Sequence, residues 1–157
     1  MNAIFKKLNF KDQKVLHVIN SPGSFKRVLE EMNQHVTVKS SLSGADSVSF
    51  FLAFVTRKSE VDTLTQAVVP LLKPEGIFWF AYPKGTSKNY KCDFNRDNGW
   101  TMLGELGFEG VRMVAIDQDW TALRFKRAHE IKLMTRSFAM SEEGKKKVAS
   151  AGPKKRS

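Results

Sequence analysis

The chain has 157 residues, of which 41% are hydrophobic and 27% charged, as expected of one globular domain that can bury a sizeable core. Its longest apolar run, Val48 to Val55, is broken only by Ser49 and is far shorter than the ~20 residues of a membrane-spanning helix. The single cysteine, Cys92, excludes an internal disulfide, and the first residues lack the apolar segment of a signal peptide. We therefore expect a bacterial cytoplasmic protein with no membrane partner.

The net charge of +10 is concentrated near the C-terminus. Residues 126–157 carry 10 Lys and Arg against 3 Asp and Glu, whereas residues 1–125 carry 16 against 13. The final stretch, EEGKKKVASAGPKKRS, has too few bulky apolar residues to offset its ordering entropy. We predict one folded domain over residues 1–127, a short helical extension over 128–140 and a basic disordered tail over 141–157.

Strand and helix patterns alternate from the start of the domain. VLHVI (15–19) predicts a short buried strand and is followed by the turn cluster NSPGSF. The spacing of one helix face then recurs, with Ser24 as the expected N-cap, at Phe25, Val28, Leu29 and Met32. HVTV (35–38) predicts a second strand, rich in β-branched residues.

Two longer strands are predicted in the middle of the chain. SVSFFLAFV (47–55) and GIFWFAY (76–82) are apolar on both faces, which is typical of central parallel strands covered by helices on both sides. Phe51, Ala53, Phe78 and Phe80 should therefore be buried. Between these strands a helix is expected, with a capping box at Ser59 and Asp62, followed by a turn at KPEG.

A loop rich in lysine follows the strand that ends at Tyr82. Asp97 or Asn98 can cap the next helix, and Gly107 should end that helix in the left-handed conformation. VRMVAI (111–116) and TALRFKR (121–127), joined by DQDW, predict an antiparallel hairpin.

This order of elements predicts an α/β fold. We expect a Rossmann-like, mostly parallel sheet of about six strands, with flanking helices and a C-terminal antiparallel hairpin. The hairpin and the stretch LLKPEGIFWF resemble elements of methyltransferase-like folds. The glycine-rich cofactor loop of those folds is not expected, because NSPGSF offers one glycine, Gly23, and Pro22 removes a donor.

The chain also resembles a bacterial family of small Rossmann-like domains of unknown function. The resemblance is carried by Pro22 and Phe25, by GIFWFAYPKGTSK with Pro83 and Lys84, by Asp93, by GELGF, and by AIDQDWTALRFKR with Asp117, Trp120 and Arg124. It spans about Leu8 to Arg127. It implies a fold of the reduced methyltransferase type and no activity.

Residue patterns for catalysis or cofactor binding are sparse. No metal ligands are expected from the scattered histidines and Cys92, no nucleophile elbow occurs, and no cofactor is predicted. His17 is interpreted as a hydrogen-bonded core residue and Cys92 as an inert thiol. Trp79 and Trp100 are interpreted as core residues.

The loop after Tyr82 is the candidate binding site. Ligands of open parallel sheets bind beyond the carboxyl ends of the strands, and cations near a helix start favour an anion there. The predicted anion site comprises Lys84, Arg96, Asn98, Trp120 and Arg124, with Asp93 and Asp117 orienting the cations. The alternative is a structural loop in which Asp93, Asp97 or Asp117 pairs with Lys84 or Arg96. Trp120 either covers the core or lines a cleft.

Three functions follow, in order of preference. The first is a non-enzymatic domain that binds a small anion or a protein partner at the loop. The second is a nucleic-acid-associated protein that uses the basic tail without sequence preference. The third is an enzyme with an unusual cofactor mode.

Overall fold

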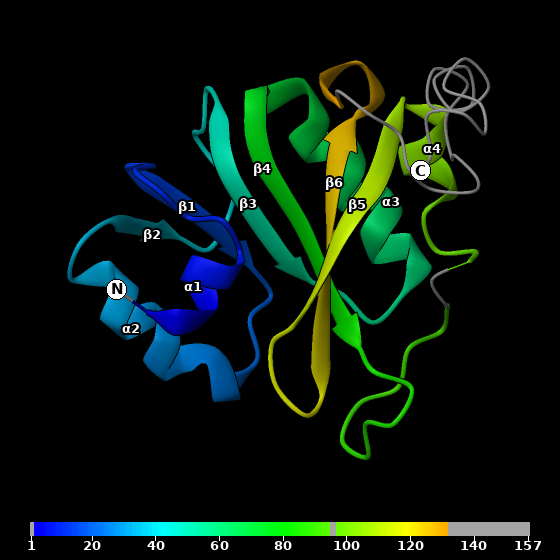
Figure 1. Ribbon diagram of the computed structural model, residues 1–157, viewed down its shortest axis with the longest axis horizontal. Coiled ribbons are helices and arrows are strands. Elements are labelled where there is room, and N and C mark those ends of the chain that lie inside the picture. The colour runs from blue at the N-terminus through cyan, green and yellow to red at the C-terminus, as the bar shows by residue number, and fades with distance from the viewer. Residues whose placement is uncertain (1, 95–96, 132–157) are drawn as a thin grey trace, which may run out of the picture.

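The computed structural model describes residues 2–94 and 97–131. The predicted helical extension beyond Ile131, the predicted tail and Arg96 lie outside the described residues. The chain forms one six-stranded sheet in the order β2-β1-β3-β4-β6-β5 (Figure 1). Its strands are β1 Val15–Ile19, β2 Thr37–Lys39, β3 Val48–Phe54, β4 Leu72–Pro83, β5 Phe108–Ala115 and β6 Trp120–Arg127.

The strand directions confirm the predicted α/β class. The first four strands are parallel, and β6 runs antiparallel between β4 and β5. The helices are α1 Ala3–Lys7, α2 Lys26–Asn33, α3 Lys58–Val68 and α4 Thr101–Glu105, with short 3-10 turns at Gly23–Phe25, Val69–Leu71 and Ala128–Glu130. The result is a Rossmann-like sheet with helices on both faces.

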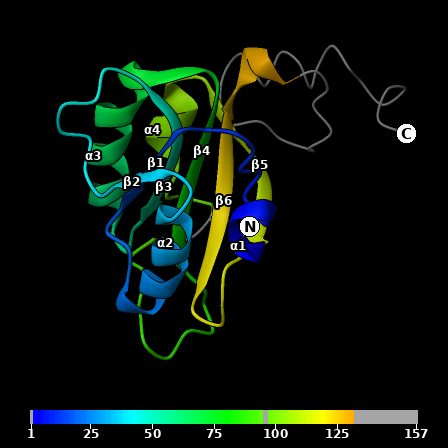
Figure 2. The same ribbon diagram turned by 90° about the vertical axis from the view of Figure 1, so that its left-hand side faces the viewer.

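Two apolar layers enclose the sheet, because its central strands are apolar on both faces and both faces must be covered. One layer joins α1 and α2 to the sheet through Phe5 and Met32, and the other joins α3 and α4 to it through Val61 and Leu103. Figure 2 shows α3 and α1 on opposite sides of the sheet. The four strand residues predicted to be buried are all fully buried: Phe51, Ala53, Phe78 and Phe80.

Helix α1 was not predicted from the sequence. The side chain of Asn2 caps it by accepting from the backbone N–H groups of Ile4 and Phe5, at 2.8 and 3.3 Å. After this helix, the indole N–H of Trp79 donates to the carbonyl of Leu8 at 3.0 Å. Trp79 is therefore a core residue, as predicted, and it fixes the N-terminal segment on the sheet.

Both predicted helix caps in the first half of the chain are wrong. Ser24 lies in the 3-10 turn before α2, and α2 has no side-chain cap. At α3 the capping carboxylate is that of Glu60, which accepts from the N–H groups of Thr56 and Arg57 at 2.9 and 3.1 Å. Asp62 instead bonds Lys58 Nζ at 3.1 Å, one helical turn away.

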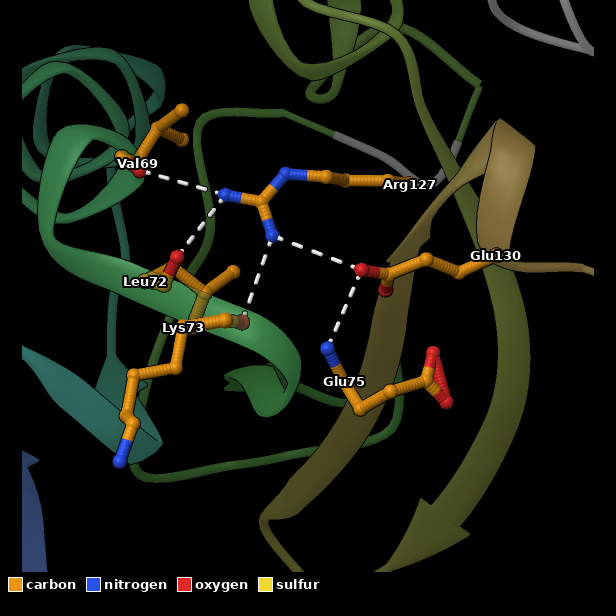
Figure 3. A network of polar contacts seen from close by, with 6 residues as sticks. All are labelled: Val69, Leu72, Lys73, Glu75, Arg127 and Glu130. Atoms are coloured by element: carbon orange, nitrogen blue, oxygen red, sulfur yellow. Dashed lines mark hydrogen bonds and ion pairs between the residues drawn. The ribbon is translucent and has the colours of Figure 1, made fainter.

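The KPEG segment, predicted as a turn, lies within β4. Glu75 there adopts a left-handed conformation with φ of 61°. The guanidinium of Arg127 at the end of β6 holds this segment by donating to the carbonyls of Val69, Leu72 and Lys73, at 3.4, 3.1 and 3.4 Å (Figure 3). Glu130 completes the network: its carboxylate lies 3.8 Å from Arg127 and accepts from the N–H of Glu75 at 3.1 Å.

Candidate functional site

The carboxyl ends of β1, β3 and β4 lie at one edge of the sheet, because these strands are parallel. The strand order changes direction between β1 and β3, which is where ligands bind in open sheets of this class. The carboxyl-edge loop, residues 84–99, leaves β4 one strand away from that point. Its position is therefore suited to a ligand site, and its contacts show how it is held.

Asp119, in the hairpin turn, fixes the first part of the loop. Its carbonyl accepts from the N–H of Lys84 at 2.8 Å. Its carboxylate accepts from the Ser87 hydroxyl at 2.9 Å and from the Asn89 side-chain amide at 3.1 Å. The sequence prediction did not include Asp119, Ser87 or Asn89. The pattern Asp117-Gln-Asp119 in a turn was the available signal, since both carboxylates can accept from local donors.

Trp120 anchors the middle of the loop to the core. It is 3% exposed and packs edge-on against Phe54, with ring centroids 5.1 Å apart. Tyr90 of the loop packs against its other side at 4.8 Å. Of the two roles considered for Trp120, the structure therefore supports the covering of the core.

Asp93 fixes the far part of the loop to α3. Its N–H donates to the Thr56 carbonyl at 2.9 Å, and its carboxylate accepts from the N–H of Lys58 at 2.7 Å. Lys58 is the first residue of α3, so Asp93 provides a carboxylate at the positive end of that helix. Next to it, Phe94 packs against Trp100 with ring centroids 5.2 Å apart, and both are core residues.

Asp117 also accepts hydrogen bonds from nearby backbone groups. One carboxylate oxygen accepts from the N–H groups of Asp119 and Trp120 at 2.8 and 2.9 Å. Asp93 and Asp117 therefore stabilise backbone segments, and neither forms an ion pair with Lys84. The predicted role of these acids toward Lys84 and Arg96 stays a prediction, because Arg96 lies outside the described residues.

The loop lysines form no ion pair with Asp93, Asp117 or Asp119 in the described part of the chain. Lys84 is half-buried, and Lys88 and Lys91 are exposed. The ion pairs Lys58–Asp62 and Arg127–Glu130 do not involve these lysines.

Asn98 lies in the turn before α4, but neither it nor Asp97 caps that helix. The N-cap position is Trp100, without a side-chain cap, and α4 has only five residues. The predicted contribution of a helix N-terminus is therefore small. Gly107 does follow the helix in the left-handed conformation, with φ of 86°, as predicted.

Arg124 is not brought to the carboxyl-edge loop. It pairs with Trp79 in the β4–β6 ladder, whereas Trp120 pairs with Pro83 at the strand end. Its Nε has no hydrogen-bond partner among the described residues. Burial lowers the pKa of Arg124, and the nearby charge of Glu75 opposes that shift.

Cys92 is a free cysteine of the loop and is partly buried. Burial raises the pKa of the Cys92 thiol, which keeps it protonated and agrees with the inert thiol predicted. Over residues 2–94 and 97–131, no group of three or more His, Cys, Asp and Glu side chains is placed to hold a metal ion. No helix in these same ranges is long and apolar enough to cross a membrane.

Comparisons with known proteins add little beyond the fold. No protein-family model matches the sequence, and a search of curated proteins finds no similar chain. Among solved structures, the chain is similar to a protein in the NADB-Rossmann superfamily from Streptococcus agalactiae. The two share 10% identity with a TM-score of 0.44 over 81% of this chain and 68% of that one. The more specific family resemblance noted in the sequence remains a prediction.

Proposed function

We propose that this protein is a non-enzymatic binding domain that holds a small phosphate- or carboxylate-bearing anion on the carboxyl-edge loop. One observation carries the proposal: Asp93, Asp117 and Asp119 bind backbone N–H groups and loop side chains, and none of these three acids forms an ion pair with a loop lysine in the region described. The acids thus shape the loop without cancelling its charge. An acidic surface of a protein partner presents the same carboxylate groups, so such a partner is the alternative ligand of the loop.

The loop is also largely preformed. Asp119, Trp120 and Thr56 fix it at three separate points, so a ligand does not have to order these segments when it binds. Preorganisation of this kind increases affinity by reducing the entropy cost of binding. In this proposal Lys84 supplies the main contact, Arg96 contributes from outside the described residues, and Asn98 lies beside them.

We further propose that the fold is a reduced methyltransferase-like domain without the usual cofactor mode. The antiparallel β6 between β4 and β5 is consistent with the closing hairpin of such folds. After β1 the left-handed position is occupied by Asn20, with φ of 58°, and Gly23 opens a 3-10 turn. We therefore expect neither S-adenosylmethionine nor a nicotinamide dinucleotide to bind. Calorimetry that gave a micromolar constant for either would contradict this.

A thermal-shift screen of inorganic phosphate, citrate and nucleotides, followed by calorimetry, tests the anion site. A charge-assisted contact contributes about 1.5–3 kcal/mol, so Lys84→Ala should weaken the anion roughly ten- to a hundredfold and leave the melting temperature unchanged. Lys7→Ala on α1 is the matched control, because it removes the same charge far from the loop. If no anion raises the wild-type melting temperature and an acidic peptide does not bind, the loop is structural.

A second candidate function rests on the charge distribution. The 10 Lys and Arg against 3 Asp and Glu over residues 126–157 favour non-specific association with nucleic acid. Such binding should weaken steeply with salt and disappear when residues 141–157 are deleted. Affinity that survives this deletion would point to the folded domain instead.

A further inference from the structure

A hollow of about 630 Å³ lies at the opposite edge of the sheet, where the amino ends of β1, β3 and β4 meet. Its walls come from three segments: the approach to β1, the crossing segment between β2 and β3, and the start of β4. We call it the amino-edge hollow and define it by Lys14, His17, Lys39, Ser47, Ser49 and Lys73. Its volume is in the range of small-molecule sites.

The hollow exists because the chain passes from β2 to β3 without a helix. Parallel strands are usually joined by a helix that covers the sheet, but residues 40–47 form an irregular segment here. Leu42 of this segment packs into the same apolar layer as α3, so the segment crosses on that face. It leaves part of β1 and β2 beside an open space instead of under a helix.

His17, in the middle of β1, lines this hollow. It is 5% exposed, and its Nδ1 is buried with no hydrogen-bond partner in the described part of the chain. It was predicted to be a hydrogen-bonded core residue, and the burial is confirmed, but this nitrogen is unpaired. A buried polar atom without a partner costs about 1–3 kcal/mol, so the position is unfavourable unless something binds there.

Three lysines line the hollow together with this histidine. Lys39 is its register neighbour on β2, so the two side chains lie on the same face of the sheet. Lys14 precedes β1, and Lys73 lies at the start of β4, where its side chain extends away from the Arg127 network (Figure 3). Two acids also line the hollow, Asp12 and Glu75, and neither forms an ion pair with these lysines in the regions described.

We propose that the amino-edge hollow is a second binding site, which takes a phosphate-bearing small molecule through Lys14, Lys39 and Lys73, beside the ring of His17. Lysines bind phosphate as point charges, and the hydroxyls of Ser47 and Ser49 supply further donors. This site is separate from the carboxyl-edge loop, since the two lie at opposite ends of the same strands.

Binding in this hollow takes up a proton. Burial lowers the pKa of His17, the charge of Lys39 lowers it further, and the backbone carbonyl of Phe50 opposes the shift, so the free ring is neutral at pH 7. A phosphate beside the ring favours the charged form, because an opposite charge at close range stabilises it. Lys14, Lys73, Asp12 and Glu75 are the other charged groups that face the hollow.

Calorimetry with ribose 5-phosphate and inorganic phosphate tests the site, in two buffers of different ionisation enthalpy. Lys39→Ala should weaken ribose 5-phosphate roughly ten- to a hundredfold, and Lys7→Ala on α1 should leave its affinity unchanged. At pH 7.5 the wild type should take up a fraction of a proton when the ligand binds, and His17→Gln should not. Since both proteins bind the same probe, the ionisation of the phosphate itself cancels in this comparison.

Each outcome decides the assignment. Binding that needs Lys39 and carries the His17-dependent proton uptake supports the hollow, and stronger binding of the sugar phosphate than of inorganic phosphate supports an organic ligand. Equal affinity in wild type and Lys39→Ala overturns the proposal, as does the absence of heat with either probe. Loss of binding in Lys84→Ala alone assigns the phosphate to the carboxyl-edge loop and also overturns it.

Discussion

The two edges of the sheet differ in how their polar side chains are hydrogen-bonded. At the carboxyl edge, the carboxylates of Asp93, Asp117 and Asp119 each accept one or two hydrogen bonds at 2.7–3.1 Å. At the amino edge, a histidine that is almost fully buried leaves one ring nitrogen without a partner. The acids of the first edge are therefore hydrogen-bonded, although the indole nitrogen of Trp120 is buried there without a partner among the described residues; at the second edge the unpaired nitrogen belongs to a titratable ring.

The difference separates two kinds of binding site. A loop held by its own acids presents charge from a rigid frame, so its ligand gains mainly from electrostatics. A hollow with an unpaired buried nitrogen gives its ligand a further gain, because binding removes a penalty that the free protein carries. Substitution of the hydrogen-bonded acids should therefore destabilise the protein at the carboxyl edge, whereas substitution of His17 should leave it unchanged or more stable at the amino edge.

The largest effect is expected in the core that both edges share. Phe78 is fully buried and packs edge-on against Phe51 and Phe108, with ring centroids 5.5 and 5.6 Å apart. Phe78→Ala should lower the free energy of unfolding by ~3–5 kcal/mol through lost transfer energy and a cavity. Denaturant unfolding measures this, with exposed Leu106→Ala as the control. A loss below ~1 kcal/mol would mean that Phe78 is not a core residue.

A smaller loss is expected at the carboxyl edge. Asp119→Ala removes the acceptor for Ser87 and Asn89 and should cost about 1–2 kcal/mol, because both bonds are partly exposed. Asp119→Asn keeps one acceptor oxygen, so its stability should lie between that of Asp119→Ala and that of the wild type. Hydrogen exchange should show faster exchange confined to residues 84–90. An unchanged exchange rate in this loop would show that Asp119 does not hold it.

At the amino edge a substitution should change the free energy of unfolding in the opposite direction. His17→Leu removes the unpaired nitrogen and should leave the stability at pH 7 equal or raise it by up to ~1 kcal/mol. A marked loss would mean that the hollow does not leave His17 unsatisfied. His35→Leu, at an exposed position, is the matched control.

The same variant should change how stability depends on pH. The pKa of His17 is lowered in the folded state from its ordinary value of 6.5, so the unfolded chain binds more protons below that pH. Stability from this group is therefore complete above pH 6.5 and declines as the pH falls below it. His17→Leu should lack this part of the decline and His35→Leu should retain it, as measured by unfolding between about pH 5.5 and 7.5. Parallel curves for wild type and His17→Leu would contradict the neutral buried ring.

The smallest effect on stability is expected from deletion of residues 141–157. These residues have few bulky apolar side chains, so their removal should not change the melting temperature of the domain. A lower melting temperature would show that this segment packs on one of the two edges.

The sequence by itself determined the sheet and most of its core. The runs SVSFFLAFV and GIFWFAY are apolar on both faces, and only a strand covered on both sides can bury both sets, so β3 and β4 followed directly. The hairpin of β5 and β6 followed from its turn residues. Helix α1 did not, because five residues give too little periodicity to recognise, and its packing depends on Trp79, 71 positions from Leu8.

Tertiary structure alone decided the sites. Whether Asp93 meets a lysine or the start of α3 depends on how Lys58, 35 residues away, is placed by the fold. Arg124 was assigned to the loop because its strand adjoins β4, but the antiparallel register sets it beside Trp79 instead of Pro83. The hollow around His17 arises from the path of residues 40–47 across the sheet. Local sequence patterns predict which residues are buried and whether a segment is a helix or a strand. A site is made of residues from distant segments, and only the folded chain brings these together.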